Sequence, residues 1–468
     1  MHGHPARIMP RTDNSKMPII ALNMIPRAIQ QVMNPALVKK DEGVEDIMMG
    51  RYISLFFSLF TILILFRWAS ELYGTTSGII AALLYSFCPN SLANASFVST
   101  DVFSVLMLLI SFYLMWKWLH SGTLKHFIFF SIAIAFSQLV KQSLFHLYVL
   151  VPLFLICCRI FDKKVLENIR KPYLLIIVFV LINFLVINFG YYFYHSFQPL
   201  GNYHFMSHLF IELQNSLPSG IPVPLPTPFV EGLDMAKYYD QIGGGMNAVS
   251  SFGKVTILGH EATGGSFWYY YFVTILFKTP VGILVLFFIG LFVKPVGWEK
   301  LLLLFPVIYF LVVFSFFYKT QAGVRHIIFL YPFIFLIAVS VWNHAISTRQ
   351  KKLFFVLCIY ILVSVSFYWA NYYPYTNELI MDKKNAWQIV GDANLEILQG
   401  RKIAEAYLKK HPDVQFVPKQ AIPGIYLLNT EQYLDTWNTG EYQWIRKYPI
   451  VGHVGYSWLL IKVPGSRL

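Results

Sequence analysis

Ionisable side chains stand at the edges of long apolar runs in this sequence. Asp101 opens one such run within NASFVSTDVFSVLMLLISFYLMW, Lys141 lies in SQLVKQS, and Arg325 lies in GVRHIIF. A charge at the edge of the hydrocarbon is costly unless it lies at the interface, is paired or has a function. A carboxylate can take or orient a proton, and Lys or Arg can hold an anion. The plainer alternative for Asp101 is that it caps the helix that follows it.

Other candidate residues lie in less specific surroundings. Lys278 lies deep in an apolar run, and His260 with Glu261 lies in GHEATGG. That stretch has no second His at helical spacing, so it does not predict a zinc protease site. The sequence also has no phosphate-binding glycine loop, no dinucleotide fingerprint and no DxD pair, and its four cysteines lie in apolar runs. We therefore predict no metal site, disulfide framework or bound cofactor.

The composition is that of a membrane protein. The chain has 468 residues, of which 56% are hydrophobic and 13% charged, and its mean hydropathy is +0.54. A soluble domain has about 25% charged residues. The formal net charge of +13 is typical of basic cytoplasmic loops. No basic stripe with interleaved aromatic residues is present, so nucleic-acid binding is excluded.

Apolar runs predict about ten membrane helices, because a helix needs about 20 apolar residues to cross a hydrocarbon core of about 30 Å. The runs are 51–70, 77–93, 98–119, 126–141, 144–160, 172–194, 268–293, 301–318, 326–343 and 353–371.

Basic links between the runs indicate the orientation. The link 159–171 holds five Lys or Arg residues and the link 344–352 holds three. An excess of Lys and Arg marks cytoplasmic loops, so we place these links, and those with Lys117 and Lys294, in the cytoplasm. The residues that then lie on the opposite, non-cytoplasmic face are Asp101, the link near Lys141, residues 1–50, the loop 195–267, Arg325 and everything after residue 372.

Three parts of the chain follow from this pattern. Residues 1–50 form an N-terminal segment, and 51–372 form the transmembrane domain with the long loop 195–267. That loop is rich in Pro, Tyr and Phe and poor in charge, so we expect it to be ordered and to lie partly in the membrane over a cavity. Charges return in 373–468, where a helical pattern and three short strand-like runs predict a small α/β domain outside the membrane.

Six stretches in order resemble polytopic glycosyltransferases of the GT-C superfamily. The resemblance is to bacterial members of glycosyltransferase family 39, relatives of the protein O-mannosyltransferases and the aminoarabinose transferases. It implies a GT-C-like fold: an α-helical polytopic membrane protein with a small α/β C-terminal extramembrane domain. The stretches are FCPNSLANASFVSTD, IAFSQLVKQSLFHLYVLVP, LGHEATGGSFWYYYFVTILFKTPVGILVL, GVRHIIFLYPF, GDANLEILQGRKIAEAYLKK and YQWIRKYPIVGHVGYSWLLIKV.

The resemblance implies an inverting transfer of a hexose or pentose from a polyprenyl-phosphate donor to a hydroxyl of a protein, lipid or glycan. Asp101 would take or orient the proton of the acceptor hydroxyl. The donor phosphate would be held by cations, namely Lys16, Lys141, Arg325 and Lys278. Glu261 and His260 would line the acceptor side. Lys16 lies in RTDNSKMPIIALNMIPRAI, which resembles the juxtamembrane segment of the family.

Departures from the family leave other interpretations open. His326 stands at the Tyr of the family's G-x-R-Y block, and Ile397-Leu398 stands at a Trp-Gly pair. The family's first membrane helix and its acidic loop do not precede residue 11, so we expect further coding sequence upstream of Met1. The alternatives are a transporter or flippase for a lipid-linked substrate, and an inactive homologue or fragment. The expected location is a bacterial inner or plasma membrane, with the site facing the periplasm or exterior.

Overall fold

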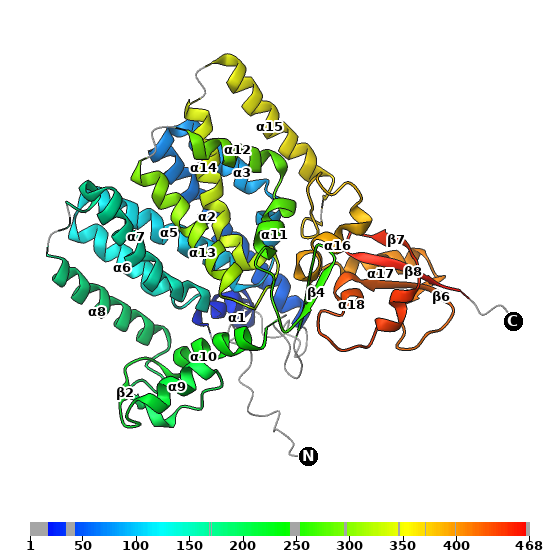
Figure 1. Ribbon diagram of the computed structural model, residues 1–468, viewed down its shortest axis with the longest axis horizontal. Coiled ribbons are helices and arrows are strands. Elements are labelled where there is room, and N and C mark those ends of the chain that lie inside the picture. Colours follow the sequence, from blue (N-terminus) through cyan, green and yellow to red (C-terminus); the bar gives the residue numbers. More distant parts are fainter. Residues whose placement is uncertain are drawn as a thin grey trace. The chain divides into compact units, whose positions relative to one another are not determined.

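The computed structural model (Figure 1) is predominantly helical, with strands in short hairpins and in one C-terminal sheet. It describes residues 17–33, 43–167, 169, 171–243, 253–293, 297–344, 347–369, 371–397 and 399–464. Lys16 lies outside these residues.

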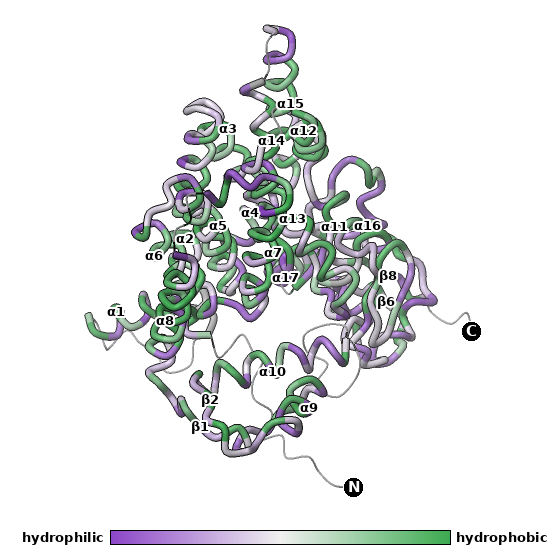
Figure 2. Tube along the Cα trace, turned by 60° about the vertical axis from the view of Figure 1, so that its left-hand side comes forward, coloured by the Kyte–Doolittle hydropathy of each residue, from purple (hydrophilic) through white to green (hydrophobic). Residues whose placement is uncertain are grey.

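Six helices in the described part of the chain are long and apolar enough to cross a membrane. Their sequences are hydrophobic along most of their length (Figure 2). The spans are Met48–Tyr73 within α2 (Gly43–Tyr73), α5 (Thr100–Ser121), Gln142–Phe161 comprising η4 (Gln142–His146) and α7 (Leu147–Phe161), α8 (Pro172–Gly190), α13 (Trp298–Phe316) and Val324–Asn343 across η7 (Val324–Leu330) and α14 (Tyr331–His344).

The other four expected crossings differ from single long helices. Run 268–293 divides into α11 (Tyr270–Lys278) and α12 (Val281–Phe292), bent by 115° where Pro280 interrupts the helix. Runs 77–93 and 126–141 contain shorter apolar helices, α3 (Thr75–Ser86) and α6 (Leu124–Ser137). The first turn of α15 (Thr348–Ser366) carries Arg and Lys side chains that lower its apolar character.

The chain forms two compact units, and the first comprises Met1–Thr61 and Ser96–Gln241. In this unit α5 packs against α6, and α6 packs against α8. The first part of the long loop is ordered, as the sequence predicts. It forms α9 (His208–Ser216), α10 (Thr227–Ile242) and a short ladder between β1 (Gln198–Pro199) and β2 (Pro222–Val223).

The second unit comprises Ile62–Ala95 and Ile242–Leu468. Its helical part contains α3, α4 (Pro89–Ala95) and α11 to α15, with α12 and α14 in close contact. The second part of the long loop forms an antiparallel hairpin of β3 (Lys254–Ile257) and β4 (His260–Thr263). Its turn has positive φ at Leu258 and Gly259, which is the backbone conformation of a tight two-residue hairpin turn.

The C-terminal region of this unit folds into a four-stranded sheet with the order β5-β6-β8-β7. β5 (Val414–Phe416) runs parallel to β6 (Gly424–Asn429), and the other neighbours are antiparallel. The three predicted strand-like runs become β5, β6 and β8 (Trp458–Val463), and the predicted helix becomes α17 (Arg401–Lys410). β7 (Ile450–Val454) is an additional strand. The predicted fold class, a helical membrane protein with a small C-terminal α/β region, is confirmed.

Candidate active site

Asp101 and Lys141 form a buried ion pair in the first unit. Nζ of Lys141 donates a hydrogen bond to Oδ1 of Asp101 at 2.7 Å. Relative exposure is 3% for Asp101 and 8% for Lys141. Buried charges persist only when they are paired or hydrogen-bonded, because desolvation is costly. The pair is therefore a specific arrangement rather than two independent surface charges.

Helix ends set the position of both side chains. Ser99 caps α5, and its side chain accepts a hydrogen bond from the backbone N–H of Asp101. Asp101 therefore lies in the first turn of α5, where helix ends favour a carboxylate. Lys141 has an extended backbone at the N-terminal end of η4, between α6 and α7. Both charges thus lie at helix termini.

A packed apolar cluster supports the backbone beside Lys141. Leu139 packs with Tyr191, Phe229 and neighbouring residues of the long loop. The backbone of Leu139 also accepts a hydrogen bond from the N–H of Ile19 in η2 (Pro18–Met24). The ordered part of the long loop and the segment after Lys16 therefore both pack against the residues that lead into Lys141.

Arg325 lies in the second unit, directly after a tightly held turn. The N–H of Gly323 donates to the hydroxyl of Tyr270 at 2.9 Å, and the N–H of Val324 donates to Oδ1 of Asn394 at 2.9 Å. Gly323 has φ +70°, and a Cβ there would lie 2.6 Å from the carbonyl oxygen of Ala393. Glycine is required at position 323 because the backbone has a positive φ and because a Cβ would clash with Ala393.

Lys278 is fully buried at the C-terminal end of α11. Its ammonium group donates to the carbonyl oxygens of Tyr373 and Asn394, each at 2.6 Å. The same Asn394 holds the Gly323 turn. Lys278 therefore connects α11 to Asn394, which in turn holds the backbone before Arg325. The hydrogen bonds from its ammonium group go to protein carbonyl oxygens.

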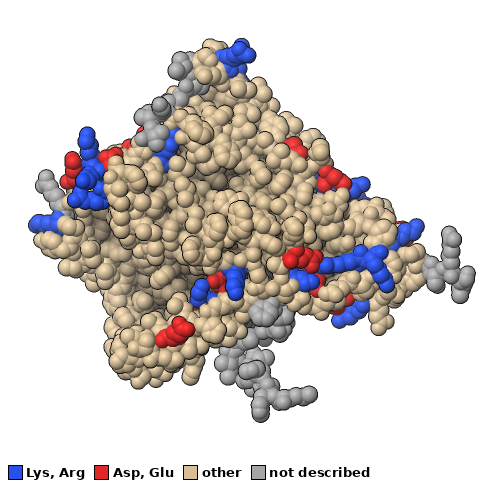
Figure 3. Space-filling model, in the orientation of Figure 1, with Lys and Arg blue, Asp and Glu red and all other residues tan. Residues whose placement is uncertain are grey.

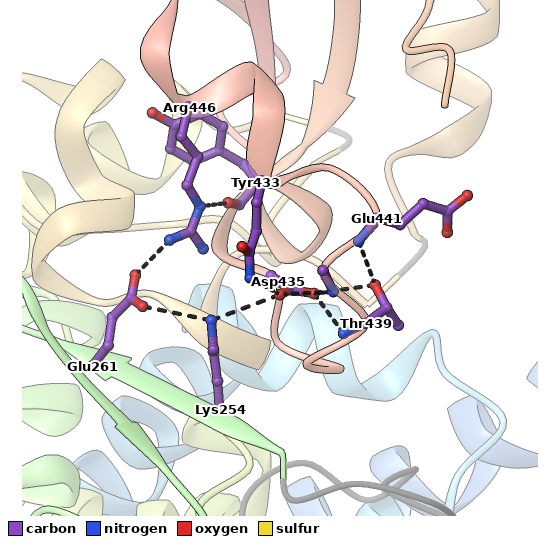
Figure 4. A network of polar contacts seen from close by, with 9 residues as sticks. Lys254, Glu261, Tyr433, Asp435, Thr439, Glu441 and Arg446 are labelled. Atoms are coloured by element: carbon purple, nitrogen blue, oxygen red, sulfur yellow. Dashed lines mark hydrogen bonds and ion pairs between the residues drawn. The ribbon is translucent and has the colours of Figure 1, made fainter. Parts of the chain in front are cut away.

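Glu261 belongs to an ion-pair network that fastens the β3–β4 hairpin to the C-terminal region. Arg446 contacts Glu261 at 3.0 Å, and Lys254 lies 3.8 Å from Glu261 and 3.6 Å from Asp435 (Figure 4). Backbone hydrogen bonds reinforce the contact, including Lys254 N–H to the carbonyl of Thr436 at 2.9 Å. Glu261 thus has an evident structural role, while His260 is exposed on the neighbouring position of the hairpin.

Hydrogen bonds keep Asp435 of this network ionised. Burial raises the pKa of its carboxyl, but donors from Gln443, Thr439 and Gly440 outweigh burial, so the pKa lies below its ordinary value. The net effect favours the charged form that Lys254 contacts.

The structure thus brings Asp101 and Lys141 together in one unit, and it links Lys278 to the turn before Arg325 in the other. Asn394 and Tyr270 were not among the predicted site residues, although both fall in stretches that carry the family resemblance. The Asn in GDAN was the available signal for Asn394. Among the described residues, no group of three His, Cys, Asp or Glu side chains is arranged to hold a metal ion.

Comparison with known proteins gives one family match. Residues 43–188 match the family model described as dolichyl-phosphate-mannose-protein mannosyltransferase. The predicted family resemblance is confirmed. The matched segment contains both Asp101 and Lys141. The match covers 146 of the 468 residues and supports the predicted resemblance over this segment.

Two solved structures are similar to this chain. ArnT from Cupriavidus metallidurans bound to undecaprenyl phosphate has 10% sequence identity and a TM-score of 0.44, over 95% of this chain and 87% of that chain. The apo state of the same protein has 10% identity and a TM-score of 0.27, over 95% and 88%. No curated protein sequence is significantly similar to this chain.

Proposed function

We propose that this protein transfers a sugar from a polyprenyl-phosphate donor to an acceptor hydroxyl on the non-cytoplasmic face of the membrane. The observation that carries the proposal is the buried pair of Asp101 and Lys141, 2.7 Å apart, within the segment that matches the mannosyltransferase family model. The pair supplies both kinds of group that the reaction needs, a carboxylate for the acceptor proton and a cation for the donor phosphate. The two groups separate when the substrates bind, because they act on opposite sides of the sugar C1.

In the proposed reaction the acceptor oxygen forms a bond to C1 of the sugar as the bond from C1 to the phosphate oxygen breaks. Asp101 takes or orients the proton of the hydroxyl, and the bond electrons leave with the phosphate. Attack opposite the leaving group inverts the configuration at C1. Positive side chains that face the departing phosphate stabilise the transition state, because negative charge grows there.

Lys141 and Arg325 are the proposed phosphate ligands, together with Lys16, which precedes the described residues. A guanidinium group can bind phosphate through two parallel hydrogen bonds, whereas an ammonium group acts as a point charge. The contacts of Lys278 with two carbonyl oxygens suit a positioning role for the Arg325 turn better than direct phosphate contact. Glu261, engaged by Arg446 and Lys254, is likewise better suited to holding the hairpin than to contacting an acceptor.

A transporter is the alternative function, and the placement of the charged pair argues against it. Transport sites lie near the middle of the bilayer, often at broken helices. Asp101 is the second residue of α5, which has 22 residues, and Lys141 precedes α7. Charges at helix ends suit a reaction on one face of the membrane.

Competition with polyprenyl phosphate tests the proposed donor. Polyprenyl phosphate should inhibit sugar transfer by the purified protein, and Lys141→Ala and Arg325→Ala should both raise the KM for the lipid-linked donor. Lys402→Ala, which removes an exposed cation from α17, is the matched control and should leave the KM unchanged. Failure of polyprenyl phosphate to bind or inhibit would refute the lipid-phosphate donor and favour the transporter.

A further inference from the structure

A cavity lies in the first unit, along α7 and the first part of α8. Its volume is about 870 Å³, within the 300–1,000 Å³ typical of small-molecule sites. Side chains from α5, α6, α7 and α8 line it, among them Trp118, Phe130, Leu155, Ile176 and Phe179. The cavity is therefore large enough for a ligand and has mainly apolar walls.

Aromatic rings form part of the wall of this cavity. Trp118 stacks on Phe130 with ring centroids 5.6 Å apart, and Phe130 stacks on Phe179 at 6.5 Å. Tyr148 also lines the cavity, but its hydroxyl donates to Oδ1 of Asn183 at 2.7 Å. The wall therefore favours a hydrocarbon chain over a polar ligand, because the Tyr148 hydroxyl already has a hydrogen-bond partner within the protein.

Charged side chains stand at one end of the same cavity. Arg159, from the last turn of α7, and Lys163, from η5 (Lys163–Leu166), line it together with Glu167, and all three are exposed. None of the ion pairs found between described residues includes Arg159 or Lys163. This end of the cavity thus has two cations and one carboxylate. Figure 3 shows Lys and Arg gathered with a few acidic side chains where this helix group ends.

The cavity is distinct from the site around Asp101. Lys141 precedes α7, whereas Arg159 lies in its last turn. A helix of 15 residues is about 22 Å long at 1.5 Å per residue. The cations of the cavity therefore lie at the opposite end of α7 from the Asp101–Lys141 pair.

We propose that this cavity binds an acidic membrane phospholipid, with one acyl chain against the aromatic wall and the phosphate at Arg159 and Lys163. Basic pockets between membrane helices bind acidic head groups in this way, because the cations attract the phosphate while the apolar walls take the chain. The basic link 159–171, which we expect to be cytoplasmic, would meet the leaflet rich in acidic lipids.

Photo-crosslinking with a phosphatidylglycerol that carries a diazirine on its acyl chain tests this proposal. The full-length protein, in phosphatidylcholine nanodiscs containing a small fraction of this probe, should be labelled on peptides within residues 147–179. Unlabelled phosphatidylglycerol should displace the probe much better than phosphatidylcholine. In Arg159→Gln/Lys163→Gln the concentration of phosphatidylglycerol needed for displacement should rise by about 25-fold, from roughly fivefold per cation.

Two variants separate this site from general lipid contact. Arg349→Gln/Lys352→Gln removes two exposed cations from α15 and should leave the labelling unchanged. Leu155→Trp places a bulky ring in the part of the cavity meant for the acyl chain and should reduce labelling although both cations remain. Equal competition by phosphatidylcholine, wild-type labelling in Leu155→Trp, or displacement by polyprenyl phosphate at lower concentrations than phosphatidylglycerol would overturn the proposal.

Discussion

Nζ of Lys141 lies 2.7 Å from Oδ1 of Asp101, and both side chains are buried although they are 40 residues apart in the sequence. A buried ion pair of this kind can be structural, functional or both. Removing one partner leaves an uncompensated charge, whereas removing both can be nearly neutral for stability. The two roles can therefore be separated by experiment.

A double-mutant cycle separates stability from activity at this pair. Lys141→Met leaves the Asp101 charge buried, so it should destabilise the protein by about 3–5 kcal/mol. Lys141→Met/Asp101→Asn should recover much of that loss, because both charges of the Asp101–Lys141 pair are then removed together. Thermal unfolding in detergent measures the stability, and sugar transfer measures the activity. The proposed chemistry predicts that the double variant regains stability and stays inactive, and recovery of both would assign the pair a structural role only.

Gly323→Ala should disturb the turn before Arg325. A backbone with φ +70° and ψ −174° is essentially restricted to glycine and costs another residue about 1–3 kcal/mol, and the new Cβ would lie 2.6 Å from the carbonyl oxygen of Ala393. We expect a lower melting temperature together with a higher KM for the donor. Gly220→Ala is the control, because a Cβ at Gly220 meets nothing within 4 Å. A wild-type melting temperature in Gly323→Ala would show that the turn is not constrained.

Asp435 should make the docking of the β3–β4 hairpin pH-dependent. Its folded-state pKa is lowered by hydrogen bonds that outweigh burial. A lowered folded pKa gives stability that is present above the unfolded pKa, about 3.9, and is lost as the pH falls through the folded value. Asp435→Asn should therefore lower the melting temperature at pH 7, and the difference from wild type should shrink below about pH 4. A constant difference down to pH 3, measured by thermal unfolding, would contradict this role.

Single-cysteine labelling tests the expected topology. In a background with its four cysteines replaced, Lys164→Cys should react with an impermeant reagent only from the cytoplasm. Lys419→Cys, in the C-terminal region, should react only from the opposite face. Both side chains are exposed, so access to the reagent depends on the membrane. Labelling of Lys419→Cys from the cytoplasm would place the C-terminal region on the wrong side for the proposed reaction.

Hydropathy and charge spacing predicted most of the fold because long apolar helices leave a strong local pattern. The division of run 268–293 into α11 and α12 did not follow from hydropathy, since both halves are apolar, although Pro280 marked the break. β7 was missed because IVGHV contains Gly and His and depends on pairing with β8.

The candidate site was predictable only in part. Asp101 and Lys141 were each predicted as site residues on the same face, but their direct contact depends on tertiary packing that no local pattern contains. Sequence placed Lys278 as a possible phosphate ligand, and its contacts with the carbonyls of Tyr373 and Asn394 lie across long sequence separations. Such contacts are set by the fold and not by neighbouring residues.

The most direct test of the central claim is sugar transfer by Asp101→Asn. Purified protein in detergent would be given a polyprenyl-phosphate sugar and an acceptor hydroxyl, with Asp413→Asn, at an exposed position, as the control. Loss of a general base typically reduces the rate by about 10²–10⁴-fold. We therefore predict that the transfer rate of Asp101→Asn falls by a factor in that range, whereas Asp413→Asn retains the wild-type rate. Wild-type transfer by a folded Asp101→Asn would contradict the account.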